Sequence, residues 1–191
     1  DSPEGPFLPF ESKLPHTPMG QMCLDGTLWV ENGTPYMIYC HEWVEMMDGT
    51  MELVELKPDL SRTVGQPIRL FCASAAEWST GSLREDGTRT YVTDGCFLYR
   101  TQTGKLLMIW SSFKNGEYAI GIAESMTGKV FGPWKQQKEP LFDKHGGHGM
   151  IFKTFDGRLC VVLHAPNSPG GAERAHIFEI EDLGYTLNLK E

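Results

Sequence analysis

The sequence predicts an all-β protein that forms part of a β-propeller of four-stranded antiparallel blades. Three short apolar runs, at 36–40, 106–110 and 159–163, each follow a turn that contains glycine, which is typical of buried strands. The 21 glycines and 12 prolines are spread too densely for long helices. We expect a single helical turn, at 74–78.

Repetition along the chain indicates the propeller. Each apolar run follows a similar strand that opens with a polar residue, a glycine, any residue and then an apolar residue, and these patterns begin at Asp25, Asp94 and His148. Third strands are expected at 49–55 and 116–123, and fourth strands at 67–71 and 139–142. Four short antiparallel strands that recur at this spacing are the pattern of propeller blades.

The repeats divide the chain into three blades and a remnant. We predict blades at 21–72, 88–142 and 145–191. The opening motif Ser2-Pro-Glu-Gly-Pro-Phe7 is similar to Gly132-Pro-Trp134 near the end of the second blade, so 1–20 is expected to be the remnant of a preceding blade. Three blades leave open sheet edges, and we expect missing N-terminal blades or another chain to cover them.

The charge balance excludes two classes of partner. Lys and Arg number 17 against 25 Asp and Glu, which gives a formal net charge of −8. Nucleic acid and anionic membrane surfaces both favour a basic face. The longest apolar runs are also far shorter than the roughly 20 residues of a membrane-spanning helix. The five cysteines include no Cys-x-x-Cys pair, which favours free thiols.

Superposing the repeats predicts where polar side chains converge. Asp25, Asp94 and His148 are expected at one position, at the start of the innermost strand beside the central channel. The second strands then end equivalently, at His41, Ser111 and His164. The alternative is that each Asp-Gly pair only forms a turn.

Several motifs, in this order, resemble glycoside hydrolase family 43, whose members are five-bladed β-propellers that act on arabinan and xylan. The motifs include Ser2-Pro-Glu-Gly-Pro-Phe7, Leu24-Asp-Gly26, Thr93-Asp-Gly95, Gly147-His-Gly149 and His164-Ala-Pro166. The resemblance implies that about three of five blades are present. It also implies hydrolysis with inversion by three carboxyl groups, one of them kept protonated by a neighbouring carboxylate and by burial.

The resemblance assigns catalytic roles to individual residues. Asp25 falls on the aspartate that tunes the pKa of the acid. Asp94 falls on the general acid, but Asp-Gly-Cys stands where Glu-Gly-Pro is usual. Glu42, between a histidine and a tryptophan near the channel mouth, is the rival acid, and its alternative is a solvent-facing side chain leading into a turn at 45–48.

Further residues are candidates for binding. An aromatic ring can stack on the C–H face of a sugar, and Trp43 and Trp110 end strands at the expected mouth, although core packing is the common alternative. The resemblance also suggests one calcium ion, or a water cluster, near His148 in the channel, and it implies no organic cofactor. The candidate substrate-binding residues are His41, Trp43, Trp110, His164, Asn167 and Arg174.

The general base is missing from the expected set. The family places it in an Asp-Pro motif of the first blade, and the 191 residues contain no Asp-Pro. We therefore expect this chain alone to be inactive. The alternatives are a non-catalytic carbohydrate-binding propeller and a propeller for protein interaction. The resemblance favours a secreted or periplasmic protein, with a cytoplasmic one left open.

Overall fold

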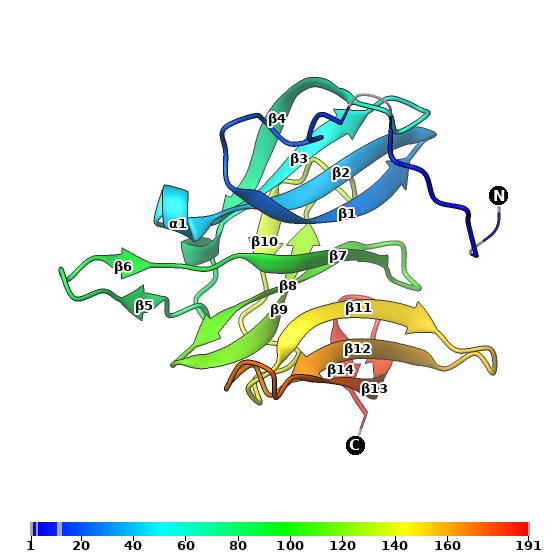
Figure 1. Ribbon diagram of the computed structural model, residues 1–191. Coiled ribbons are helices and arrows are strands. Elements are labelled where there is room, and N and C mark those ends of the chain that lie inside the picture. Colours follow the sequence, from blue (N-terminus) through cyan, green and yellow to red (C-terminus); the bar gives the residue numbers. More distant parts are fainter. Residues whose placement is uncertain (1, 3, 11–12, 191) are drawn as a thin grey trace.

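The computed structural model describes residues 2, 4–10 and 13–190, and it confirms the all-β prediction. Three four-stranded antiparallel sheets follow one another in chain order as blades (Figure 1). The strands of the first blade are β1 (Cys23–Glu31), β2 (Thr34–His41), β3 (Thr50–Leu56) and β4 (Thr63–Cys72). Those of the second are β7 (Asp94–Arg100), β8 (Leu106–Lys114), β9 (Glu117–Ser125) and β10 (Trp134–Gln136). Those of the third are β11 (Gly147–Lys153), β12 (Leu159–Ala165), β13 (Arg174–Asp182) and β14 (Leu187–Leu189).

The first strand of each blade lies innermost. Strand β7 contacts both β1 and β11, so the three inner strands lie side by side (Figure 1). A two-stranded hairpin, β5 (Ser82–Leu83) and β6 (Arg89–Thr90), projects from the connection between the first two blades. No helix in the described part of the chain is long and apolar enough to cross a membrane.

Three local predictions need correction. The fourth strand of the second blade is β10, whereas 139–142 contributes only an isolated bridge from Phe142 to Ile120. At 74–78 the structure has only the 3-10 turn η1 (Ala73–Ala75). The expected turn at 45–48 instead begins as the short helix α1 (Trp43–Met46).

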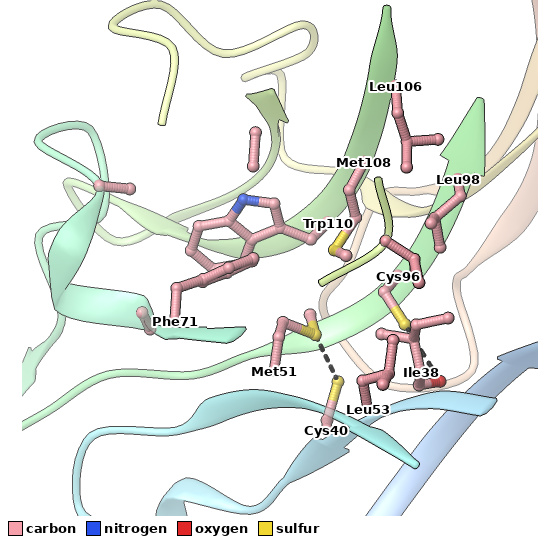
Figure 2. Close-up of a cluster of buried hydrophobic side chains, with 14 of the residues drawn as sticks. Ile38, Cys40, Met51, Leu53, Phe71, Cys96, Leu98, Leu106, Met108 and Trp110 are labelled. Carbon is pink, nitrogen blue, oxygen red and sulfur yellow. Dashed lines mark hydrogen bonds between the residues drawn. The ribbon is translucent and has the colours of Figure 1, made fainter. Parts of the chain in front are cut away.

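The middle blade is buried on both faces, which explains the continuous apolar run of β8. Successive side chains of a strand point to opposite faces. Leu106, Met108 and Trp110 accordingly pack in the core against the first blade, while Leu107 and Ile109 pack against the third. Figure 2 shows the first of these clusters, with Trp110 beside Phe71 and Met51.

The repeat assigned to the chain opening also has a structural counterpart. In both turns the glycine N–H donates to the carbonyl oxygen three residues earlier, from Gly5 to Ser2 and from Gly132 to Lys129. Both glycines have a positive φ, of 83° and 78°. The described residues before β1 form no helix or strand.

The open faces of the outer blades are partly apolar. In β1, Trp29 packs against the core while its neighbours Leu28 and Val30 are exposed on the opposite face. In β13, Phe178 packs against the core and Ile177 is 64% exposed. Each outer blade therefore presents apolar side chains away from the blades that this chain contains.

Candidate active site

The inner strands share a β-bulge that organises the site. Pairing with the second strand is interrupted after Leu24 in β1, after Asp94 in β7 and after Gly147 in β11. The next residue along each strand has a left-handed backbone, with φ of 57° at Asp25, 46° at Gly95 and 56° at His148. A bulge of this kind re-aims a side chain locally.

This register corrects the predicted superposition. Asp25 and His148 are equivalent, but their counterpart in the middle blade is Gly95, so Asp94 lies one residue earlier than predicted. In the second strands, Leu24 pairs with Cys40, Asp94 with Ser111 and Gly147 with His164. Cys40, not His41, is therefore the equivalent of Ser111 and His164.

The three bulges meet at Gly95. Its N–H donates to Asp25 Oδ2 at 3.1 Å, and Asp25 Oδ1 lies 3.7 Å from His148 Nε2. A Cβ atom at Gly95 would lie 2.7 Å from the imidazole ring of His148. Glycine is thus required for both its φ and the close approach of three blades, and it fixes the orientation of the Asp25 carboxylate.

Asp94 is a half-buried carboxyl group held by Tyr118. The Tyr118 hydroxyl donates to Asp94 Oδ2 at 2.7 Å, and the Tyr118 ring stacks on His164 with centroids 5.5 Å apart. Burial raises the pKa of Asp94, the hydrogen bond from Tyr118 acts in the opposite direction, and the charge of Asp25 raises it further. Asp94 is therefore oriented by a residue from β9 of its own blade.

Glu42 is 8% exposed, so the alternative of a solvent-facing side chain is wrong. Its backbone N–H donates to Met22 O at 2.8 Å, and it precedes α1. In the described part of the chain its carboxylate has no hydrogen-bond or ion-pair partner. Burial raises the pKa of Glu42, and the negative charges of Asp94 and Asp25 raise it further. Burial and the neighbouring charges therefore favour the protonated form of the Glu42 carboxyl group.

His41 fixes the segment that carries Glu42. Its Nε2 lies 2.9 Å from Glu45 Oε2 on α1, and its Nδ1 lies 3.2 Å from Glu52 Oε1 on β3. Burial alone would lower the pKa of His41, but the hydrogen bonds to Glu45 and Glu52 raise it overall. Both ring nitrogens of His41 are therefore engaged by protein carboxylates, and substrate binding by His41 stays a prediction.

The two candidate tryptophans have different environments. Trp110 has no exposed surface, and its indole N–H donates to Gln136 Oε1 at 2.9 Å. The prediction that Trp110 contacts substrate is therefore wrong, because the strand continues past it and both faces are covered. Trp43 is half-buried on α1, with the guanidinium carbon of Arg84 5.9 Å from its ring centroid.

A second group of candidates gathers beside the third blade. His148, His164 and Arg174 line one shallow depression of about 280 Å³. The Oδ1 atom of Asn167 lies 2.9 Å from His164 Nε2, and the Arg174 guanidinium donates to the carbonyl oxygen of Glu173 at 2.7 Å. These four predicted residues all come from the third blade, and Asp25 of the first blade lies 3.7 Å from His148.

The calcium site has little support from the described residues. Calcium takes 6–8 oxygen ligands. No three His, Cys, Asp or Glu side chains among the described residues gather as a metal site, and the nearest carboxylate to His148 is already bound by the Gly95 N–H. Calcium binding near His148 therefore stays a prediction.

Sequence reasoning missed Tyr118 and gave Ser111 no role. Ser111 Oγ accepts the backbone N–H of His148 at 2.8 Å, which joins the second and third blades at the bulge. One signal was available for Tyr118. Strand alternation within the expected strand 116–123 places Tyr118 on the same face as Ile120 and Ile122, which pack towards the third blade.

A stability measurement tests the environment of Asp94. Since burial raises the pKa of Asp94, its folded state binds a proton more tightly than the unfolded chain, and stability is lost as the pH rises through the folded pKa. Asp94→Asn is therefore expected to be more stable than the unmodified protein at pH 7. The difference should shrink as the pH falls through the raised pKa of folded Asp94 towards the ordinary value of 3.8, and it should be lost below that value, as measured by urea unfolding at several pH values.

Asp156→Asn is the matched control. The pKa of exposed Asp156 is lowered by hydrogen bonds from Thr154 and Arg158, so its loss should not stabilise the protein at pH 7. Equal responses of the two variants across the pH range would contradict the environment assigned to Asp94.

The fold and this site define a class of protein. Asp25 and Asp94 lie on the inner strands of neighbouring blades, and Glu42 follows β2 of the first blade, where the charges of both aspartates act on it. A propeller with carboxyl groups clustered in this way is suited to glycoside chemistry. The chain belongs to Glycosyl hydrolases family 43, whose family profile matches residues 1–182.

Solved structures agree with this family. An endo-arabinase from Bacteroides thetaiotaomicron VPI-5482 is 47% identical, with a TM-score of 0.86, over 95% of this chain and 63% of that one. A thermostable family-43 glycoside hydrolase is 25% identical, with a TM-score of 0.82, over 100% of this chain and 64% of that one. An endo-1,4-beta-xylanase from Bacteroides thetaiotaomicron, at 21% identity and a TM-score of 0.78, shares the fold over 100% of this chain and 65% of that one.

The chain spans less than two thirds of the length of these three structures. No curated protein matches it.

Proposed function

We propose that the protein containing this chain hydrolyses glycosidic bonds in arabinose-containing plant polysaccharides, with inversion at the anomeric carbon. The observation that carries the proposal is the buried, unpaired carboxyl group of Glu42 beside Asp25 and Asp94. The 47% identity to an endo-arabinase supports arabinose over xylose as the sugar, since the xylanase is only 21% identical.

In the proposed mechanism Glu42 is the general acid. Water attacks the anomeric carbon while the bond from this carbon to the leaving oxygen breaks, and Glu42 gives its proton to that oxygen. A base on the opposite side of the sugar takes a proton from the water. The charges of Asp25 and Asp94 favour the protonated form of Glu42 before the reaction, which is the environment that a general acid needs at neutral pH.

The remaining candidates are proposed to hold the sugar. Trp43 follows Glu42 directly and offers a half-buried ring for stacking. On the other side, His164 and Arg174 line the depression beside His148, and Asn167 hydrogen-bonds His164. This division would place the scissile bond between the first and third blades.

We propose that the base comes from further blades outside these 191 residues. Inverting glycosidases separate acid and base by about 6.5–9.5 Å with water between them. Asp25, Glu42 and Asp94 all act on one another electrostatically, and two of them serve the acid in this mechanism. The exposed apolar faces of β1 and β13 are suitable surfaces for such blades.

The test is hydrolysis of linear arabinan, xylan and an aryl arabinofuranoside by the full-length protein, with proton NMR to record the first anomer released. Arabinan hydrolysis with the inverted anomer is expected. Arabinan binding without hydrolysis would favour the non-catalytic carbohydrate-binding alternative, in which Asp94 in place of glutamate marks a lost acid. Turnover by the isolated 191 residues would overturn the proposed location of the base.

A further inference from the structure

A large cavity lies at the outer ends of the second and third blades, far along the sheets from the inner strands. Its volume is about 910 Å³. Strand β10 and the segment 137–141 form one wall, and β14 with Tyr185 and Thr186 forms the other. It shares no lining residue with the carboxyl site, and it lies between two blades that are already packed together.

Tyr185 is an exposed aromatic side chain on a firmly held turn. Tyr185 is one of the residues that line the cavity, and it is 59% exposed. Gln137 Nε2 donates to Tyr185 O at 2.8 Å, and Thr186 Oγ1 donates to Gln137 Oε1 at 2.6 Å. On the other side of the turn, Thr101 Oγ1 donates to Gly184 O at 2.9 Å. The backbone that carries the ring is therefore fixed from both flanks.

Asp182 adds a second set of ties to the same turn. Its Oδ2 accepts from the Tyr99 hydroxyl at 2.9 Å and from the Gln102 N–H at 2.7 Å, while its backbone oxygen accepts from Gln102 Nε2 at 2.7 Å. These bonds join the blades without any need for an exposed ring. A rigid aromatic side chain loses little conformational freedom on binding, which is an advantage for a ligand contact.

The charges around the cavity indicate a neutral ligand. Three lysines and three glutamates line it, so they balance, and Lys105 and Glu124 are already paired with each other. The side-chain amide of Asn188 has no partner among the described residues and is free to hydrogen-bond. The volume lies in the range of about 300–1,000 Å³ that small-molecule sites occupy. One ring face, one free amide and balanced charge are suited to a neutral sugar.

We propose that this cavity is a second saccharide-binding site, which holds a short neutral segment of the polysaccharide substrate. Tyr185 stacks on a sugar ring and Asn188 hydrogen-bonds its hydroxyl groups. The identity of the polymer rests on the proposed function, whereas the site itself rests on the cavity and on the exposed Tyr185, whose backbone is fixed. Such a site would increase the local concentration of polymer at the enzyme and have no effect on a small substrate.

The test uses full-length protein carrying Glu42→Gln, so that bound polymer is not consumed. Arabinan binding is measured by affinity electrophoresis and by titration calorimetry with arabino-oligosaccharides, with and without Tyr185→Ala. We expect Tyr185→Ala to weaken polymer binding by roughly tenfold. Phe155→Ala is the matched control, because Phe155 is a fully exposed aromatic residue in the turn between β11 and β12, outside the cavity.

The activity arm uses protein with Glu42 intact. Tyr185→Ala should lower turnover at low arabinan concentration severalfold and leave kcat/KM for an aryl arabinofuranoside unchanged. Urea unfolding of both variants checks that the fold is retained. If Tyr185→Ala and Phe155→Ala bind arabinan equally well, the second site is wrong. If Tyr185 matters for binding but the unmodified protein hydrolyses nothing, the second site stands and the proposed function fails.

Discussion

Replacing Glu42 with glutamine is expected to lower kcat on linear arabinan by about 10²–10⁴-fold, the usual contribution of a general acid. Glutamine keeps the shape of the side chain but has no acidic proton for the leaving oxygen. The leaving group of an activated aryl arabinofuranoside needs less protonation, so Glu42→Gln should lower kcat on that substrate much less. Steady-state kinetics with both substrates measure this difference.

The pH dependence of activity provides an independent test of Glu42 as the general acid. A general acid must be protonated, so activity falls as the pH rises through its pKa. Burial and the charges of Asp94 and Asp25 raise the pKa of Glu42, which moves this fall to higher pH than for an ordinary glutamate. The Glu42→Gln protein should lack this basic limb, since its residual activity no longer depends on that ionisation.

Asp94→Asn and Glu42→Gln together decide which candidate is the general acid. The control is Glu55→Gln, which changes a half-buried glutamate on β3 and should leave the kinetics unaltered. Asp94→Asn should lower kcat without the dependence on the leaving group, because Asp94 acts through the pKa of Glu42 in the proposed mechanism. If Asp94→Asn instead shows the dependence and Glu42→Gln does not, the acid is Asp94.

The sequence was sufficient for the blades but not for the exact register at the site. The pattern of a polar residue followed by glycine recurs at Asp25, Asp94 and His148, yet the left-handed position falls on the glycine only in β7. Either residue of such a pair tolerates the left-handed conformation. Aspartate and histidine adopt it more readily than most other residues do, and glycine adopts it freely. Only the pairing with the second strand decides which residue takes it.

The environment of Glu42 also could not be read from local sequence. Its backbone N–H donates to Met22 O, and the charges that raise its pKa come from Asp25 on β1 and Asp94 on the next blade. The interpretation of Trp110 failed for a related reason. The predicted strand stopped at that residue, whereas β8 continues to Lys114 and places the indole in the middle of a blade interface.

Replacing Trp110 with alanine is expected to lower the free energy of unfolding by about 3–5 kcal/mol, the usual cost of removing a buried tryptophan or phenylalanine side chain. Its ring centroid lies 4.9 Å from that of Trp78 and 5.3 Å from that of Phe71, and all three residues belong to one core cluster. Figure 2 shows Trp110 and Phe71 within this cluster. The variant would also leave Gln136 Oε1 without its donor. Urea unfolding monitored by circular dichroism measures the loss.

Trp43→Ala provides the contrast for this experiment, because Trp43 is half-buried on α1 and lies outside the core clusters. It should cost less than about 1 kcal/mol of stability, as expected for a site away from the core, and raise KM for arabinan in the proposed mechanism. Trp110→Phe keeps an aromatic ring in the core and should retain a measurable folded state if the alanine variant unfolds. A Trp110→Ala protein of undiminished stability with a raised KM would reverse the two assignments, since it would place Trp110 in the substrate site and leave the core packed without it.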